Sequence, residues 1–416
     1  MRRLFLCIVA IQLFAVAVLL GNASGQVTTL RWATWGPQPV DRQLIEAFEQ
    51  EHPNIKIEYI ASSGTGEHHS KMKVLAAGGV GADVYAVDGV YLVEFVTSGL
   101  LQAIDDLLEK EDSFSLADFF PAALPDIQYR GKTYGLPYIS APLYMVYNVE
   151  HVREAGLAKP EIHWNRQTYE EYVRKLARSE GGVVTRYGST QFLQTGSHAI
   201  WPWLWSEGAR MFSEDLSHFT MTESEAVSVM EWLAQLNRAG VTGGGNFAQQ
   251  SASITAMYPG GFPTVTGVEW PFEWDVIIHP EGPGGQYSVW KGNVMAISAF
   301  TEYREEAWTL LKFLLAPESR GHEIYVTNKR MPPSTRDPRL WELYQGTGSD
   351  PQSLYETTML LALRHGRPLP HLLQWSVIIN DTIRPALARV ASGAAPARQA
   401  MEEIQNVIDS LLKNEP

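Results

Sequence analysis

Three short motifs suggest catalysis or metal binding, and each lacks a feature that its chemistry requires. Gly131-Lys132-Thr133 matches the end of a phosphate-binding loop, but Asp126 occupies the position of the first glycine. His322-Glu323 begins the helical zinc motif, but Val326 stands where the second histidine is needed. His68 and His69 are adjacent, so their rings cannot share one helical face. These motifs therefore predict no catalytic residue, no metal site and no cofactor.

Aromatic residues carry a different chemical signal. The chain of 416 residues contains 13 Trp and 17 Tyr. Such rings stack on the apolar C–H faces of a sugar, whose hydroxyls then need charged or amide partners. The same rings also fill protein cores, so composition leaves both roles open for each of them. The 46 acidic residues leave a further possibility open, a secreted glycoside hydrolase with two carboxylates about 5–10 Å apart.

Residues 1–25 have the features of a signal peptide. Two arginines precede the apolar run Leu4–Leu20, and Ala23-Ser24-Gly25 supplies small residues before the predicted cleavage. Cys7 is the only cysteine and lies too early in the apolar run for lipid attachment. We therefore predict a periplasmic protein without a lipid anchor, a disulfide or a catalytic thiol.

Charge and length narrow the class further. The formal net charge is −13, and it becomes −15 once the two arginines of the signal peptide are removed. A protein this negative is repelled by nucleic acid and by anionic membrane surfaces, so we expect neither as a partner. The length predicts two or three domains.

The apolar pattern from Leu30 alternates between strand and helix. Strands are predicted at 30–35, 55–59 and 83–87, and helices at 41–51, 71–77 and 91–97. This order predicts a layered α/β lobe that binds its ligand at the carboxyl ends of the strands. Later in the chain we predict strands at 252–258 and 289–298 and helices at 168–178, 222–238, 302–315, 375–390 and 396–413.

The stretch Gly131–Asn148 contains two short β-type runs interrupted by Pro137 and Pro142. Each proline lacks a ladder donor and favours extended geometry in the residue before it. One interpretation is a pair of linked strands that crosses between two bodies, with Tyr138 and Ser140 facing a cleft. An edge hairpin within a single domain is the alternative.

Several motifs in a fixed order support a family resemblance. They are Gly81-Ala82-Asp83-Val84 with Ser98-Gly99-Leu100-Leu101, then Gly131–Pro137 with Tyr147-Asn148, then Ala256-Met257 before Gly260, and Glu306-Ala307-Trp308 with Phe313-Leu314. In this order and spacing, the mature chain resembles the family 1 extracellular solute-binding proteins of sugar-uptake ABC transporters. The resemblance implies a type II-like periplasmic binding protein fold, with two α/β lobes joined by hinge strands. It places residues 26–138 and 292–331 in lobe 1, and residues 139–291 and 332–416 in lobe 2.

The resemblance also implies where a ligand would bind. Phe262 stands where the family often has a stacking Trp, so stacking there would be weaker. Together with the cleft-facing loops and aromatic residues noted above, the predicted ligand-binding residues are Trp35, Gln38, Ser63, Gly64, Asp88, Tyr91, Tyr138, Ser140, Ser197, His198, Trp203, Gly260, Phe262, Trp270, Trp290, Lys291 and Trp375.

The function that the resemblance implies is solute binding without catalysis. We expect a monomer that closes its lobes on a di- or oligosaccharide and delivers it to membrane permease subunits. Two alternatives remain: a non-sugar solute of the glycerol phosphate or polyamine type on the same fold, and the secreted glycoside hydrolase.

Overall fold

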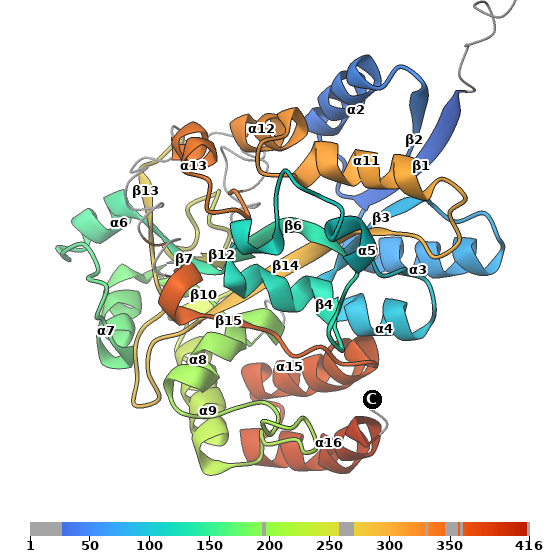
Figure 1. The fold of residues 1–416 in the computed structure, drawn as a ribbon. Coiled ribbons are helices and arrows are strands. Elements are labelled where there is room, and N and C mark those ends of the chain that lie inside the picture. The colour runs from blue at the N-terminus through green and yellow to red at the C-terminus, as the bar shows by residue number, and fades with distance from the viewer. Residues whose placement is uncertain are drawn as a thin grey trace, which may run out of the picture.

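The computed structural model describes residues 27–193, 197–257, 270–328, 332–345, 357 and 361–413. The predicted signal peptide lies outside these ranges. The chain forms two lobes, each with helices packed on a β-sheet (Figure 1). Among the helices within the described ranges, none is long and apolar enough to cross a membrane.

Lobe 1 is built on a mixed sheet. Its strands lie in the order β15 (Gly366–Pro368), β14 (Ser288–Ile297), β3 (Val84–Asp88), β1 (Thr28–Trp35) and β2 (Ile55–Ser62), and β6 (Gly135–Pro142) also pairs with β14. β1 is parallel to β2 and β3, whereas β14 is antiparallel to β3 and β6. The lobe's main helices are α2 (Pro39–Glu51), α3 (Thr65–Ala77), α4 (Leu92–Thr97), α11 (Arg304–Leu315) and α12 (Arg320–Thr327). The predicted strand–helix alternation is confirmed.

Side-chain alternation along these strands gives lobe 1 two cores. Trp32, Val84 and Met295 are buried on one face, in a cluster that includes side chains of α2 and α11. Tyr85 and Val294 are buried on the other face. Both faces are covered, which explains why these strands are apolar nearly throughout.

Lobe 2 has a smaller antiparallel sheet, in the order β12 (Ile254–Met257), β7 (Tyr144–Asn148) and β13 (Trp274–Ile277). Tyr144 and Val146 of β7 pack with Trp341, while Met145 and Tyr147 face the larger helical core. A parallel pair, β10 (Ser189–Thr190) and β11 (Thr242–Gly243), completes the strands named for this lobe. Its helices include α6 (Val149–Glu154), α7 (Arg166–Leu176), α8 (Trp201–Ser206), α9 (Ser224–Arg238), α13 (Pro338–Gln345), α15 (Arg384–Ser392) and α16 (Ala397–Leu412).

The predicted crossing corresponds to β6 and β7. β6 pairs with β14 in the sheet of lobe 1, and after Leu143 the chain enters β7 in the sheet of lobe 2. A hairpin within one domain does not describe this path. The predicted lobe boundaries at 138/139 and 291/292 fall inside β6 and β14, although both strands pair within the sheet of lobe 1, as does β15, which lies in the range predicted for lobe 2. The exact boundaries stay predictions.

One residue of this crossing has a strained backbone. Ile139 has a φ of 45°, and the pairing of β6 with β14 shifts register between Lys291 and Asn293. A β-branched residue in the left-handed region costs about 1–3 kcal/mol. The surrounding strands must therefore hold the crossing in this shape.

One predicted helix differs from the structure. Instead of a regular helix over 375–390, the chain forms the π-helix η7 (Ser376–Ile383) and then α15. Pro385 lacks the N–H that would bond to the carbonyl of Asp381, and its ring crowds that carbonyl. A wider turn before Pro385 relieves the conflict. The prediction missed this because the apolar spacing continues across the irregular turn.

A buried histidine makes the stability of this fold sensitive to acid. His279 is 1% exposed, and its ring lies 5.9 Å from that of Trp203. Neither ring nitrogen has a hydrogen-bond partner among the residues that the structure describes. Burial lowers the pKa of His279 to about 3. The residue is therefore neutral in the folded protein at pH 5, where an exposed histidine is protonated.

We predict that His279→Leu weakens the acid sensitivity of folding. Below pH about 6.5 the unfolded chain binds a proton at this residue and the folded chain does not, so the free energy of unfolding falls as pH falls. Removing the group should reduce that loss by up to about 1.4 kcal/mol per pH unit. Urea unfolding at pH 7 and pH 5 measures the difference, with exposed His163→Leu as the control. Equal pH dependence in wild type and His279→Leu would contradict the assignment.

Candidate ligand-binding site

Two charged side chains of lobe 1 meet at the carboxyl end of β3. Asp88 is the last residue of β3, and the Lys291 Nζ of the neighbouring β14 lies 2.7 Å from its Oδ2. The side chains are 5% and 19% exposed, respectively. Asn293 pairs with Asp88 in the sheet, which brings Lys291 past the end of β3. The ion pair is thus positioned by strand register.

Aromatic rings from three elements lie next to this pair. His69 of α3 accepts a hydrogen bond at Nε2 from the backbone N–H of Asp88, 3.0 Å away. Its Nδ1 lies 2.7 Å from the carbonyl of Thr65 and must therefore carry the proton. The His69 ring stacks on Tyr91 at 4.4 Å and lies 5.4 Å from Trp35, the last residue of β1. The strand ends of lobe 1 thus present aromatic rings beside a carboxylate and an ammonium.

Lobe 2 contributes an aromatic pair next to the Asp88–Lys291 ion pair. His198 belongs to the short helix η4 (Ser197–Ile200), and its ring stacks on Trp375 with centroids 6.1 Å apart. Asn380 of η7 lies 3.5 Å from the Tyr91 hydroxyl, so the lobes also touch through polar atoms. Side chains from both lobes therefore meet at one place.

A second buried carboxylate lies behind the ion pair. Asp126 accepts the backbone N–H of Gly292 at 2.5 Å, and its other oxygen lies 3.0 Å from His371 Nε2. It also packs against Gly89, where an added Cβ would come within 2.5 Å of Asp126 Oδ1. Asp126 therefore contacts Gly89 and Gly292, the residues that follow Asp88 and Lys291 in the sequence.

Burial and the Lys291 charge set the protonation of the cluster. Burial is the largest single influence on the Asp88 carboxyl and works to raise its pKa, but Lys291 and the neighbouring histidines together lower the pKa below its usual value. Burial, reinforced by Lys291, lowers the pKa of His198 to about 3, and burial lowers the pKa of His69 to about 4. For Asp126 burial dominates and raises the pKa, although His371 opposes it. At neutral pH Asp88 is therefore ionised beside Lys291, and His69 and His198 are uncharged.

This combination suits a polyhydroxylated solute. A carboxylate accepts hydrogen bonds and an ammonium donates them, so the pair can bind adjacent hydroxyls. Trp35 is partly exposed and offers a ring for an apolar C–H face, whereas Tyr91 and Trp375 are only 9% and 3% exposed in this structure. No group of three or more metal-ligating side chains occurs within the described ranges.

Six of the predicted binding residues are brought together in this cluster: Trp35, Asp88, Tyr91, His198, Lys291 and Trp375. Their contacts with a ligand stay predictions.

Three other predicted residues lie in loops after β1 and β2 and have local roles. The Gln38 backbone N–H donates to Asp41 at 2.8 Å where α2 begins. The Ser63 hydroxyl donates to Glu67, and Gly64 precedes the first turn of α3. They lie at the ligand edge of lobe 1, yet no described contact joins them to the cluster.

The hydrophobic cores contain three of the predicted residues, Tyr138, Trp203 and Trp290, which corrects their proposed exposure to a cleft. Tyr138 shares the strand face of Leu136 and packs 5.7 Å from Tyr325. Trp203 lies 5.1 Å from Trp232 in the core of lobe 2.

Six predicted ligand-binding residues remain. They are Trp290, Trp270 and four residues whose side chains the structure does not describe. Trp290 is 1% exposed and packs 5.8 Å from Phe120, and it is the third core residue. Trp270 stacks on Phe272, with centroids 5.7 Å apart, in a separate aromatic group. Ser140 and Ser197 are placed by their backbone in β6 and η4, without a described side chain, and Gly260 and Phe262 lie outside the described residues.

Sequence reasoning missed His69, Asp126, His371 and Asn380 as members of the cluster. A signal existed for His69, because His69, Met72 and Ala76 share one buried helical face. Asp126 lies in the short 3-10 helix η3 (Pro121–Ile127) and His371 lies in a loop, and neither element has an apolar periodicity that marks the residue. Asn380 lies in the π-helix, where regular helical spacing misplaces side chains.

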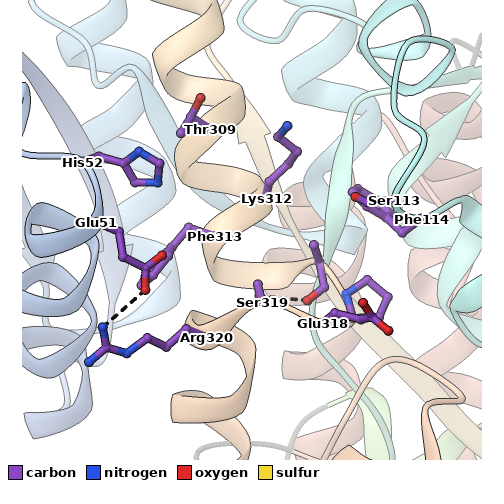
Figure 2. A pocket seen from close by; sticks show the side chains of 12 residues that line it. Glu51, His52, Ser113, Phe114, Thr309, Lys312, Phe313, Glu318, Ser319 and Arg320 are labelled. Carbon is purple, nitrogen blue, oxygen red and sulfur yellow. Dashed lines mark hydrogen bonds and ion pairs between the residues drawn. The ribbon is translucent and has the colours of Figure 1, made fainter.

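A surface pocket elsewhere on lobe 1 is a weaker candidate. It has a volume of about 400 Å³ and lies between the end of α2, α11 and the start of α12 (Figure 2). Its cations are already paired, Arg320 with Glu51 at 3.3 Å and Lys312 with Glu111 at 2.9 Å. The pocket also lacks any contribution from lobe 2. We therefore take the cluster around Asp88 as the candidate site.

Comparisons with known proteins agree with the fold and the resemblance. A lipoprotein of Streptomyces antibioticus, described as uncharacterized, is 24% identical over 419 residues, covering 94% of this chain and 89% of that protein. A maltotriose-binding protein of Pyrococcus abyssi is 26% identical over 139 residues, covering 32% of this chain and 29% of that protein. The ABC substrate-binding protein Lmo0181 of Listeria monocytogenes, solved in complex with cycloalternan, superposes with a TM-score of 0.83 at 18% identity, over 93% of this chain and 99% of that chain.

The structural likeness establishes the two-lobed fold of periplasmic binding proteins. The model of one family matches residues 35–321, more than half of the chain. This protein belongs to the family of bacterial extracellular solute-binding proteins.

Proposed function

We propose that this protein is the extracytoplasmic binding component of an ABC importer and that it binds a di- or oligosaccharide between its lobes. The observation that carries the proposal is the meeting of the Asp88–Lys291 pair of lobe 1 with the Trp375–His198 stack of lobe 2. A sugar needs both hydroxyl partners and flat apolar surfaces, and this site offers the charged partners from lobe 1 and aromatic rings from both lobes.

Related proteins support a carbohydrate ligand. One relative is named for maltotriose, and the Listeria protein of the same fold was solved with cycloalternan. A sugar that touches both lobes would favour the closed arrangement, and the crossing through β6 and β14 is a suitable hinge. The closed, loaded form would then deliver the sugar to the permease subunits.

The proposal includes a cellular setting and a mode of action. We infer a monomer that diffuses freely in the periplasm after removal of residues 1–25. The lipoprotein among its relatives makes a lipid anchor the alternative to test. Binding is proposed to occur without turnover of the sugar.

Other solutes fit the cluster less well. A glycerol phosphate would compete with Asp88 for Lys291, which is already engaged at 2.7 Å. A polyamine would use the carboxylates but leave the rings of Trp35 and Trp375 without a flat apolar partner. A glycoside hydrolase would consume the sugar, so product analysis distinguishes it from a binding protein.

We predict that an oligosaccharide raises the melting temperature of the protein and is recovered unchanged. A ligand that binds only the folded state stabilises it by about 2.7 kcal/mol at one hundred times its Kd. A thermal-shift panel should contain maltotriose, maltose, mannobiose, spermidine and glycerol 3-phosphate, followed by chromatography of the recovered sugar. A shift with spermidine or glycerol 3-phosphate alone would contradict the sugar assignment, and steady release of smaller sugars would contradict binding without turnover.

We predict that Trp375→Ala weakens binding of the responding sugar by about 1–3 kcal/mol, because an aromatic contact with the ligand is lost. Isothermal titration calorimetry measures the change. Trp308→Ala is the matched control, because Trp308 packs beside Phe114 in the core of lobe 1. The control should lower the melting temperature and leave the Kd unchanged. Equal Kd values for Trp375→Ala and wild type would place Trp375 outside the binding site.

A further inference from the structure

The segment that leads to Trp375 has no helix or strand before Trp375, whose own backbone is helical and begins the turn into η7. It runs from the end of β15 at Pro368 to the start of η7 at Ser376. Leu369, Leu372 and Trp375 are buried in the same core. Apolar burial fixes how deeply a segment lies, but it has little directional preference. Orienting the indole of Trp375 therefore calls for a directional contact.

The contact between Asp126 and His371 supplies that direction. His371 lies four residues before Trp375, and its Nε2 is 3.0 Å from Asp126 Oδ1. The two side chains are 16% and 2% exposed, respectively. Asp126 itself is held by the backbone N–H of Gly292 and packs against Gly89. These two glycines directly follow Lys291 and Asp88 in the sequence.

The contact between Asp126 and His371 therefore links the Asp88–Lys291 pair of lobe 1 to the segment of lobe 2 that carries Trp375. On one side, Asp126 touches the backbone next to both members of the ion pair. On the other side, His371 belongs to the segment that carries Trp375, whose ring stacks on His198. Removing His371 would leave a buried carboxylate with one hydrogen bond fewer, and burying a poorly satisfied carboxylate is unfavourable. Asp126 and the segment would both have to shift.

We propose that Asp126 and His371 are positioning residues, which hold Trp375 in register with the Asp88–Lys291 pair. The inference deepens the proposed function and rests on it for the role of Trp375 in sugar binding. The position of the indole itself can be measured without any ligand.

Fluorine NMR of the full chain labelled with 5-fluorotryptophan tests the proposal. Trp375→Phe identifies the Trp375 resonance by its disappearance. His371→Leu and His371→Ala both remove the hydrogen bond and should shift or broaden this resonance. His371→Gln keeps an N–H donor and should restore a position close to that of wild type. His163→Leu is the matched control, because His163 forms an exposed pair with Glu281 at 3.2 Å.

The proposal is overturned if the Trp375 resonance keeps its wild-type position and width in both His371→Leu and His371→Ala. It is also overturned if His371→Gln disturbs the resonance as strongly as His371→Ala does, since the effect then does not depend on the hydrogen bond. The two loss variants differ in size, so a folding defect in one leaves the other to be measured.

Calorimetry with maltotriose then connects position to binding. We expect His371→Leu to weaken the Kd about tenfold, or about 1.4 kcal/mol, and His371→Gln to weaken it less. If wild type does not bind maltotriose while the fluorine result stands, the identity of the sugar is wrong and the positioning role remains. If maltotriose binds equally to wild type and His371→Leu, the pair does not position the binding site.

Discussion

The ion pair between Asp88 and Lys291 is the interaction on which the candidate site depends. A carboxylate that is 5% exposed would be costly alone, and removing one partner of a buried pair costs about 3–5 kcal/mol. The pair exists because β14 runs antiparallel beside β3 and passes the carboxyl end of that strand. The sheet of lobe 1 thus brings a carboxylate from β3 and an ammonium from β14 together at the carboxyl end of β3.

The rest of the cluster follows from that placement. Asp88 orients His69 through its backbone N–H, and His69 in turn stacks on Tyr91. Behind the pair, Asp126 contacts the next backbone residues and reaches His371 of the segment that leads to Trp375. Lobe 2 contributes mainly aromatic surface, and lobe 1 contributes the charges. A solute that contacts the charged pair of lobe 1 and the Trp375 ring of lobe 2 can do so only when the lobes come together, which is the physical basis for coupling binding to closure.

The sequence predicted the framework better than the site. Strand–helix alternation and the two prolines of the crossing follow local rules, so β1, β2, β3 and the passage from β6 to β7 were foreseen. Asp88, Lys291 and Trp375 were predicted ligand contacts and lie in the cluster, and their contact with a ligand stays a prediction.

The failures have a common physical cause. Tyr138 and Trp203 are aromatic residues near a crossing or a Trp-rich helix, but burial is decided by which face of an element meets another element. That information is tertiary. Asp126 lies in a short 3-10 helix and His371 in a loop 245 positions away, so no periodicity could pair them.

Hydrogen–deuterium exchange with and without saturating maltotriose tests most directly whether a sugar is bound by both lobes at once. The account predicts slower exchange at 84–92 and 288–293 in lobe 1 together with 369–380 in lobe 2. Protection limited to one lobe, or centred on the pocket between α2, α11 and α12, would contradict it.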